Sequence, residues 1–436
     1  MGHDIIIGRD DADKERFGDK GLIYIGKGYV KMGSSSSLSN KIYMDVARSH
    51  VVLVAGKRGS GKSYSLGVIA EELANLPFET SKNIASLIFD TMGVFWTMKY
   101  PNEKDSSLLS EWQLKTKSLP VRIFVPFGRV EDYKEKGIPV DDTFALKISE
   151  LEADDWITLF NLQMTSLPAV LIQRTIIELR DKVGDFSLAD VHMAIEHDRK
   201  SNSDTKEIAS TLFYAADGWG IFSKEKTGTE ISDLVKAGTT TILDTSVYSS
   251  IGSFNIRALV ISLVSRKLFR LRMDARKEEE LFAISYGRDY LSYESERSEP
   301  LIWMFIDEAH EFMPKDSTTP ATESLKQILR EGRQPGISIV LATQQPGQIH
   351  RDVMTQSDIV ISHRVTSRPD VRALNEIMQS YLLEDIKQQM DDLPALKGSA
   401  VILDDNSERL YPVRIRPRFT WHGGEAPTAI RAGIKI

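Results

Sequence analysis

The chain has 436 residues, no cysteine, and 55 Lys and Arg against 62 Asp and Glu, a formal net charge of −7. Its length suits about two or three structural units, its acidity argues against a monomer that coats nucleic acid with a general basic surface, and the lack of cysteine excludes disulfides and iron–sulfur clusters. No apolar run approaches the ~18 residues that span a bilayer and no secretion signal opens the chain, so we expect a cytoplasmic protein that does not bind membranes.

The first 45 residues form a small N-terminal β region in our interpretation. Short strand-like pieces occur at Ile5–Ile7, Leu22–Ile25 and Tyr29–Met32, and Ser34–Ser37 is predicted to be a flexible loop. The region is too short for a complete barrel domain, so we expect an appendage over residues 1–45.

A phosphate-binding loop is predicted where the chain reads Val51–Ala55, then GKRGSGKS, then a helical pattern up to Leu73. Glycines let consecutive backbone N–H groups turn toward phosphate oxygens, and the helix that follows adds its positive end. Lys62 is expected to reach the β and γ phosphates of ATP, and Ser63 to bind Mg²⁺. The residues expected to bind the nucleotide are Gly56, Lys57, Arg58, Gly59, Ser60, Gly61, Lys62, Ser63 and Tyr64.

A second buried strand, Ile84–Asp90, ends in an acid. An acid at the carboxyl end of such a strand faces the ligand edge of an open α/β sheet, so Asp90 either lies near the nucleotide or a subunit interface, or caps a turn. Val121–Val125 is a further strand candidate, and the first part of the core is predicted to cover residues 46–130.

A mainly helical insertion is predicted over residues 131–236, because apolar residues recur with helical spacing from Leu151 to Leu234. Ser187 is a candidate helix cap within it. The sheet resumes at Thr239–Asp244, and a long helix follows from about Asn255 to Glu280. The basic residues of its second half, Arg266 to Lys277, indicate a solvated face or, alternatively, nucleic-acid contact.

The apolar run Leu301–Ile306 predicts a strand buried on both faces, and Asp307 and Glu308 follow at its carboxyl end. At the edge where the phosphate-binding loop opens, Asp307 can hold Mg²⁺ and Glu308 can act on the water that attacks the γ-phosphate. Two acids after an apolar run are a weak signal alone, but a strong one beside a phosphate-binding loop.

Arg333 is a candidate catalytic residue that would act on a neighbouring subunit. The helix predicted from Thr319-Pro320 ends near Gly332 and runs back from the catalytic edge, which places Arg333 about 18 Å away from it. A phosphate that Arg333 touches would therefore belong to another subunit. Arg330 and Arg364 are alternative candidates for this role, and a cation at a helix C-terminus also has a purely structural explanation.

The strand Ser338–Ala342 is followed by Gln344, which can hydrogen-bond both the attacking water and a γ-phosphate oxygen. The loop Gly347–Arg351 after it is our candidate for a substrate-facing loop. Ile359–Ser362 closes another strand, and the second part of the core is predicted over residues 237–404. Residues 405–436 are expected to form a hairpin and a tail that packs on another surface, either of the same chain or of a neighbouring subunit.

The sequence Asp307-Glu308-Ala309-His310 also spells the DEAH motif of two-domain helicases. Too few residues follow it for a second RecA-like domain, because the strands at Ser338–Ala342 and Ile359–Ser362 are needed to complete the first sheet. We therefore expect an α/β fold with one RecA-like P-loop NTPase core per chain. A ring of subunits would supply the missing groups.

The chain resembles the HerA branch of the HerA and FtsK translocase superfamily from about Ala47 onward. The resemblance rests on GKRGSGKSYSLGVIAEEL, the helical insertion, WMFIDEAHEF, LREGRQPGISIVLATQQP, SDIVISHRV and the closing RPRFTWHGG. It implies a hexameric ATPase that moves along double-stranded DNA, works with a nuclease such as NurA, and uses Arg333 as a trans finger and Gln344 as a sensor. An ATP-gated scaffold for an effector nuclease, without processive movement, is the alternative function.

The chain departs from this family at two places. The N-terminal β domain of HerA proteins is longer than 45 residues, which leaves the capping of the ring and the docking of a partner open. A further arginine expected just before the first core strand has two candidate positions, Arg48 and His50.

Overall fold

The computed structural model describes residues 4–32, 35–250, 255–286, 297–378 and 386–424. Within them one mixed sheet of 13 strands runs in the order β1-β3-β2-β13-β12-β11-β4-β10-β9-β5-β8-β6-β7. The strands are β1 Ile5–Ile7, β2 Leu22–Met32, β3 Ser35–Asp45, β4 Val51–Ala55, β5 Ile84–Asp90, β6 Arg122–Pro126, β7 Asp142–Phe144, β8 Thr240–Asp244, β9 Leu301–Ile306, β10 Ile337–Thr343, β11 Ile359–His363, β12 Ser399–Asp404 and β13 Arg409–Ile415.

The centre of the sheet is parallel, and it brings the ends of three strands to one edge. β10 lies between β4 and β9, with Thr343 opposite Ala55 and Leu341 opposite Ile306. β11 pairs with β4 on its other side, and β5 pairs with β9. These strands are continuous apolar runs because both of their faces are covered. The carboxyl ends of β4, β9 and β10 therefore meet, as the two motifs require.

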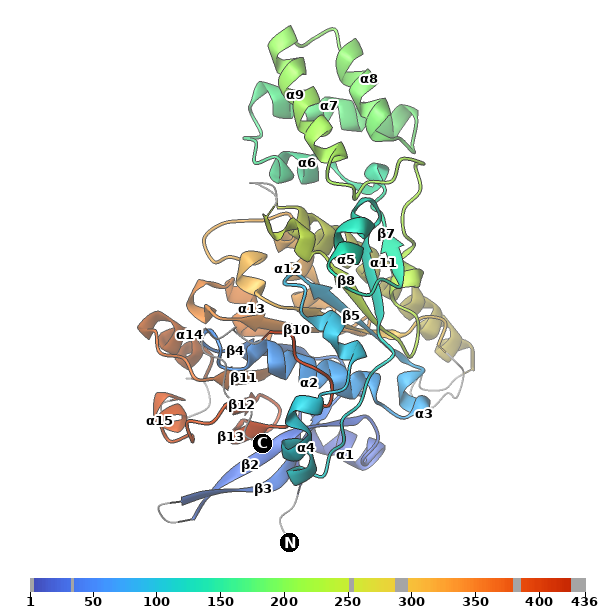
Figure 1. Ribbon diagram of the computed structural model, residues 1–436. Helices are drawn as coiled ribbons and strands as arrows, with labels where there is room; N and C mark the ends of the chain where they lie inside the picture. The colour runs from blue at the N-terminus through green and yellow to red at the C-terminus, as the bar shows by residue number, and fades with distance from the viewer. Residues whose placement is uncertain (1–3, 33–34, 251–254, 287–296, 379–385, 425–436) are drawn as a thin grey trace.

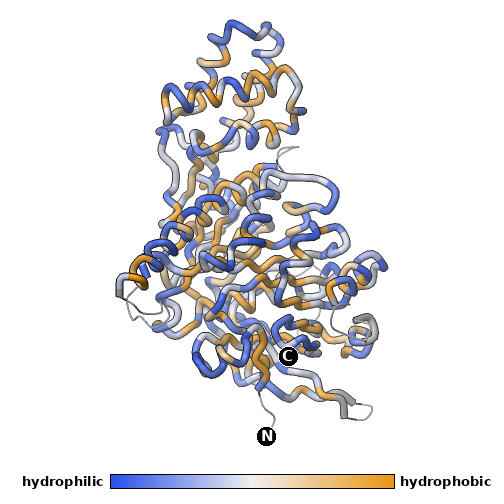
Figure 2. The backbone as a smooth tube through the Cα atoms, turned by 180° about the vertical axis from the view of Figure 1, so that it is seen from behind, coloured by the Kyte–Doolittle hydropathy of each residue, from blue (hydrophilic) through white to orange (hydrophobic). Residues whose placement is uncertain are grey.

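Helices cover both faces of the sheet (Figure 1). Alternate residues of β4 divide between two apolar clusters, with Leu53 on the face of α11, α12 and α13 and Val52 on the face of α2. The tube view shows hydrophobic residues concentrated in the interior of the main body (Figure 2). The helices are α1 Asp11–Phe17, α2 Lys62–Ala74, α3 Phe78–Ser81, α4 Ser106–Glu111, α5 Val130–Glu135, α6 Ala153–Leu159, α7 Leu167–Lys182, α8 Leu188–His197, α9 Ser203–Asp217, α10 Ile231–Leu234, α11 Ile256–Tyr286, α12 Thr322–Glu331, α13 Arg351–Gln356, α14 Arg368–Met378 and α15 Ile386–Asp391.

The N-terminal strands extend the main sheet instead of forming a separate appendage. β2 pairs antiparallel with both β3 and β13, so the pieces predicted at Leu22–Ile25 and Tyr29–Met32 belong to one long strand. The loop predicted at Ser34–Ser37 is wrong for Ser35 to Ser37, which pair with β2, while Ser34 lies outside the described residues. Backbone pairing with β2 outweighs the turn preference of a serine run.

The helical insertion projects from one end of the molecule, away from β2 and β3 (Figure 1). Trp156 packs against Phe160, Phe213 and Phe222, which gives α6 to α9 an aromatic core. Between α5 and this helical cluster, β7 pairs with β6 in the main sheet. Ser187 caps the start of α8 as expected, because its side chain accepts the Asp190 N–H.

The tail after β13 packs on its own chain. Glu71 of α2, which is fully buried, accepts hydrogen bonds from the side chains of Arg416 and Arg418 and from the backbone N–H groups of Phe419 and Thr420. Residues 416–420 of the tail therefore pack on their own chain. A polar network buries this segment where its few apolar residues could not.

The predicted hairpin of β12 and β13 is present, and α12 ends at Glu331 as expected, although it begins at Thr322 and not at Pro320. Within the described part of the chain no helix is both long and apolar enough to cross a membrane.

Candidate nucleotide site

The loop between β4 and α2 is anchored on both neighbouring strands. The Gly56 N–H donates to the Thr343 carbonyl at the end of β10 (3.3 Å), and the Lys57 N–H donates to the Arg364 carbonyl after β11 (3.0 Å). Gly59 (φ +75°) and Gly61 (φ +113°) have left-handed backbone angles, which glycine adopts without strain. The loop thus has the shape that turns its N–H groups toward an anion at the start of α2.

A buried histidine, His363, packs against Gly56 at the start of this loop. A Cβ on Gly56 would lie 2.6 Å from the Cβ of His363, so only glycine fits there. The His363 ring is hydrogen-bonded to Ser65 Oγ (2.8 Å) and to the Ser399 carbonyl (3.1 Å). Burial lowers the pKa of His363 to about 4, so the ring stays neutral beside Lys62. No motif marks His363, because its place depends on β11 lying next to β4.

Lys62 is buried at the start of α2, and its Nζ donates to the Lys57 carbonyl (3.3 Å). Burial lowers the pKa of Lys62, while Glu308 and Asp307 oppose the shift. A buried cation whose hydrogen bond goes to a neutral carbonyl favours a bound anion. The Tyr64 hydroxyl accepts from the Arg418 N–H (2.6 Å), which leaves the backbone amide of Tyr64 for the predicted nucleotide contact.

Asp307 and Glu308 follow β9 at the same edge of the sheet. The Glu308 N–H donates to Asp307 Oδ1 (2.8 Å), and Glu308 has left-handed backbone angles (φ +50°), which are unusual for a residue with a side chain. Such a conformation is costly and is found most often at functional sites. His310 Nδ1 lies 3.5 Å from Glu308 Oε2 and 3.2 Å from Thr343 Oγ1, and it thereby links the acid to β10.

The environment of Glu308 suits a general base. Burial raises its pKa to about 7, the Asp307 charge adds to the rise, and Lys62 opposes it. A carboxylate with a pKa near neutrality can accept a proton from water and still be ionised at physiological pH. Burial also raises the pKa of Asp307, and the Ser63 hydroxyl bonded to it has the opposite effect.

The family model of the HerA helicase central domain matches residues 23–268, more than half of the chain, and the Zonular occludens toxin model matches residues 301–368. The chain belongs to the HerA family. It is 30% identical over 102 residues to a probable DNA double-strand break repair helicase HerA of Methanocaldococcus jannaschii, and 31% identical over 107 residues to the DNA double-strand break repair helicase HerA of Pyrococcus furiosus.

These alignments cover 23% of this chain in both cases, and 20% and 18% of the two relatives. Among solved structures, VirB4 of Thermoanaerobacter pseudethanolicus has a TM-score of 0.56 at 12% identity, covering 92% of this chain and 98% of VirB4. At this identity the likeness concerns the fold, and it confirms the prediction of an α/β P-loop ATPase fold.

Gln344 of this HerA-like chain directly follows β10, between the strand of the phosphate-binding loop and the strand of the acids. It is half-buried at the edge where Thr343 contacts His310. The loop Gly347–Arg351 that follows is tied to the segment after Glu308, because the Lys315 N–H donates to the Gln348 carbonyl (2.9 Å) and the His350 N–H to the Met313 carbonyl (2.8 Å). The segment that follows Glu308 and this loop are therefore hydrogen-bonded to each other.

Arg333 lies just before β10 begins, at the amino ends of the parallel strands and therefore opposite the phosphate-binding loop. Its side chain is 68% exposed, and Nη2 contacts Asp358 Oδ2 at 2.8 Å. Arg330 pairs with Asp352 (2.7 Å), and Arg364 is exposed beside its own phosphate-binding loop. Arg364 is thus placed for a contact within its own site, whereas Arg333 can act only on a different copy of the site.

Arg48 and His50, the two candidates for a further arginine-like role, have different environments. His50 is 3% exposed and lies between Asp45 and Asp358. The Arg48 side chain is 38% exposed and contacts Asp13 (2.7 Å). The geometry favours Arg48 for any contact outside the chain.

Asp90 caps a turn, the second of its two predicted roles. Its carboxylate accepts hydrogen bonds from the backbone N–H groups of Met92, Gly93, Val94 and Phe95. Burial and then the neighbouring Asp244 raise the pKa of Asp90 to about 7.

The basic residues of α11 mostly form ion pairs within the chain, such as Arg266 with Asp155 (2.7 Å). These pairs support the interpretation of a solvated helix face over that of nucleic-acid contact.

A magnesium ion suits the donors at the catalytic edge. In the described ranges no group of three or more His, Cys, Asp or Glu could hold a metal ion by itself. Mg²⁺ bound with a nucleotide needs only one or two protein oxygens, because phosphates and water supply the rest. The hydroxyl of Ser63 and the buried carboxylate of Asp307, which already contact each other, provide them.

Proposed function

We propose that this chain hydrolyses ATP in a site that two neighbouring subunits of a ring complete together. The observation that supports this most is the separation of charges across the sheet. Lys62, Asp307 and Glu308 lie at the carboxyl ends of the strands, while the exposed Arg333 lies at the opposite edge. Subunits arranged head to tail in a closed ring bring these two edges together.

Each residue of the site has a defined task in this proposal. Lys62 and the N–H groups of the loop bind the phosphates, Glu308 accepts a proton from the attacking water, and Gln344 orients that water. Arg333 of the neighbouring subunit stabilises the charge that develops on the γ-phosphate. Ser63 and Asp307 would hold Mg²⁺, which neutralises phosphate charge when bound.

We further propose that the ring is a hexamer in the cytoplasm, that hydrolysis drives movement along double-stranded DNA, and that a NurA-like or other effector nuclease is its partner. The family membership and the names of the two relatives, both DNA double-strand break repair helicases, support this assignment. The hydrogen bonds between the segment after Glu308 and the loop Gly347–Arg351 provide a route by which the state of the nucleotide could reach DNA in the channel.

The test is ATPase activity measured with and without duplex DNA. Wild-type protein is expected to hydrolyse ATP faster with duplex DNA, and Lys62→Ala and Glu308→Gln are expected to abolish turnover. Activity that is indifferent to the presence, length and ends of the duplex would contradict the translocase assignment. Mixing Arg333→Ala with Lys62→Ala subunits should restore hydrolysis, because some interfaces then combine an intact Lys62 with an intact Arg333.

The alternative is an ATP-gated scaffold that holds an effector nuclease without processive movement. The projecting insertion favours it, because Leu167, Val170 and Ile177 on α7 are exposed apolar residues that could receive a partner. Displacement of a protein roadblock from duplex DNA separates the two functions, since it requires movement. Nuclease activation without displacement would establish the scaffold.

A further inference from the structure

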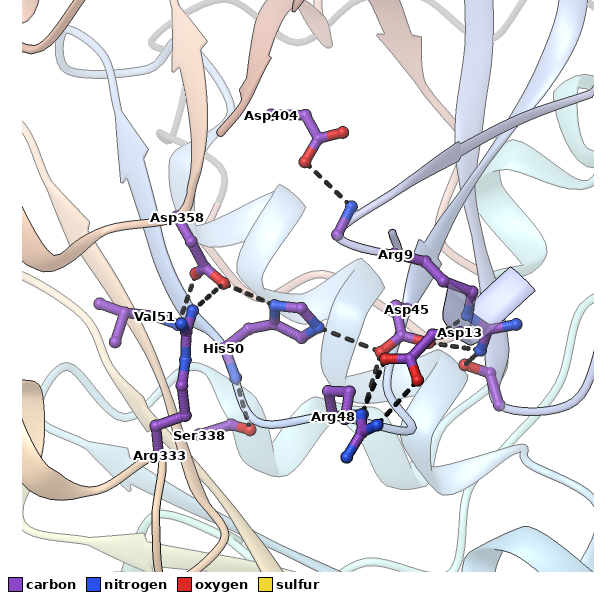
Figure 3. A network of polar contacts seen from close by, with 12 residues as sticks. Arg9, Asp13, Asp45, Arg48, His50, Val51, Arg333, Ser338, Asp358 and Asp404 are labelled. Carbon is purple, nitrogen blue, oxygen red and sulfur yellow. Dashed lines mark hydrogen bonds and ion pairs between the residues drawn. The ribbon is translucent and has the colours of Figure 1, made fainter. Parts of the chain in front are cut away.

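A chain of alternating charges crosses the sheet edge at which Arg333 lies (Figure 3). It runs from Arg9 to Asp45, His50, Asp358 and Arg333, and each neighbouring pair is in contact. The first four residues are at least 90% buried, but the last is mostly exposed. The series therefore begins inside the N-terminal region and ends at the surface.

Asp358 is the fixed point of this series. Its Oδ1 accepts the Val51 N–H (2.8 Å), and its own N–H donates to the Val51 carbonyl (3.1 Å), so the residue is fastened to the start of β4. Its Oδ2 contacts both His50 Nδ1 (2.7 Å) and Arg333 Nη2 (2.8 Å). The carboxylate cannot turn toward Arg333 or away from it without breaking several of these bonds.

His50 is held as firmly as Asp358. Its N–H donates to Ser338 Oγ (3.1 Å), and its Nε2 lies 3.2 Å from Asp45 Oδ2. Gly8 packs against the ring, since a Cβ at that position would lie 3.0 Å from His50 Cε1. Two carboxylates on opposite sides of one ring favour the protonated imidazole, which then donates from both nitrogens.

Arg333 differs from an ordinary surface arginine. An exposed ion pair normally contributes little, because two mobile side chains must be ordered together. Here the carboxylate is already immobile, so only Arg333 loses freedom. The guanidinium has five N–H donors. Nη2 carries the contact with Asp358, and Arg333 also lines a cavity of about 330 Å³ together with Arg48, Arg276 and Arg297.

We propose that Asp358, held by His50, is the positioning residue that aims Arg333 at the nucleotide of the neighbouring subunit. The Arg9–Asp45 pair fastens this unit to the N-terminal strands. This inference rests on the composite site proposed above. It adds that the direction of Arg333 is set within its own subunit before the ring forms.

The opposite arrangement makes an opposite prediction. If Asp358 instead held Arg333 back from the interface, its removal would release Arg333 and raise turnover. Positioning requires that removal lower turnover, because a misplacement of about 1 Å can cost about 100-fold in rate. The sign of the change therefore decides between them.

The first experiment compares steady-state kinetics of the full-length Asp358→Asn ring with wild type. We expect kcat to fall roughly 10- to 100-fold while KM for ATP changes less than about 2-fold, because the residue acts on the transition state through Arg333. In an Arg333→Ala background the same substitution should have no further effect on kcat. An unchanged or increased kcat, or an additive effect in that background, would overturn the proposal.

Subunit mixing provides the second experiment. Asp358→Asn mixed with Lys62→Ala should regain activity. Asp358→Asn mixed with Arg333→Ala should not, because no subunit in that mixture has both Arg333 and Asp358 intact. The reverse pattern would show that Asp358 acts on its own phosphate-binding loop and would refute the positioning role. If the mixture of Arg333→Ala and Lys62→Ala also fails to regain activity, the composite site itself is wrong, so the two failures can be told apart.

Asp404→Asn is the matched control. Asp404 is a buried carboxylate on β12 at the same edge, where it accepts the Gly8 N–H (3.1 Å) and the Ser407 hydroxyl (2.6 Å). We expect it to leave kcat within about 2-fold of wild type. If Asp358→Asn does not fold, Asp358→Glu keeps the charge but displaces the carboxylate by one methylene, and it should lower kcat in the same selective way.

Discussion

At the scale of single residues, burial sets the chemistry of the catalytic edge. Glu308 is partly enclosed beside Asp307, and Lys62 compensates for only part of the cost of its charge. Burial also keeps the neighbouring His363 neutral, so this ring adds no positive charge next to Lys62. Burial at this edge thus raises the pKa of Glu308 and lowers the pKa values of Lys62 and His363.

The first prediction concerns the pH dependence of hydrolysis. Glu308 can accept a proton only when ionised, and burial raises its pKa to about 7. The kcat for ATP should therefore rise with pH between about 6 and 8 and level off above. Steady-state kcat measured across that range checks this. A kcat that is flat from pH 6 to 8 would show that another group limits the proton transfer.

A second prediction concerns His50 and stability. Burial opposes its charge, but hydrogen bonds to Asp358 and Asp45 outweigh burial and raise the pKa of His50 to about 9 from an ordinary 6.5. A raised pKa in the folded state stabilises the protein fully below about pH 6.5, and that contribution, on the order of 3 kcal/mol, is lost as pH rises through 9. The midpoint of thermal unfolding should fall over this interval in wild type, and less so in His50→Gln.

At the scale of elements, those defined by a local sequence pattern could be predicted from the sequence, and those defined by contacts between distant segments could not. The strands β4, β9, β10 and β11 could be predicted because an apolar run bounded by polar residues is readable within one segment. The cluster of Asp45, His50 and Asp358 could not, since it forms only where β11 lies beside β4. The packing of the tail on its own chain could not be predicted because its partner, Glu71, lies far away in the sequence.

The third prediction tests that tail. Glu71 is fully buried and contacts the guanidinium groups of both Arg416 and Arg418. Glu71→Ala should lower the free energy of unfolding by about 3–5 kcal/mol, because it leaves buried arginine charge without this partner. Thermal unfolding of the variant measures the loss. Glu79→Ala, which removes an exposed ion pair with Lys82, should change stability by less than about 1 kcal/mol.

At the scale of the whole molecule, the sheet separates the two halves of the site. The phosphate-binding loop and the Asp307-Glu308 pair could be predicted from residue spacing. The order of the 13 strands in the described part of the chain, and the pairing of β2 with β13, could not be predicted, because pairing between distant segments leaves no local pattern. The consequence is functional: a long sheet with Lys62 at one edge and Arg333 at the other cannot complete its own site by a small movement.

The last prediction follows from that geometry. If each site needs Arg333 from a second subunit, turnover per subunit must depend on protein concentration, because dilution separates the two halves. Above the assembly concentration, kcat should be constant, and below it turnover should fall by about 10³- to 10⁵-fold, the range that a trans-acting arginine contributes. Sedimentation measured over the same dilution series should show the rings dissociating at the concentration where turnover falls. Arg333→Ala provides the control, since it should assemble normally yet show low turnover at every concentration. A diluted, monomeric wild type that keeps its full rate would place all of the catalytic groups in one chain, and the exposed position of Arg333 would then need another explanation.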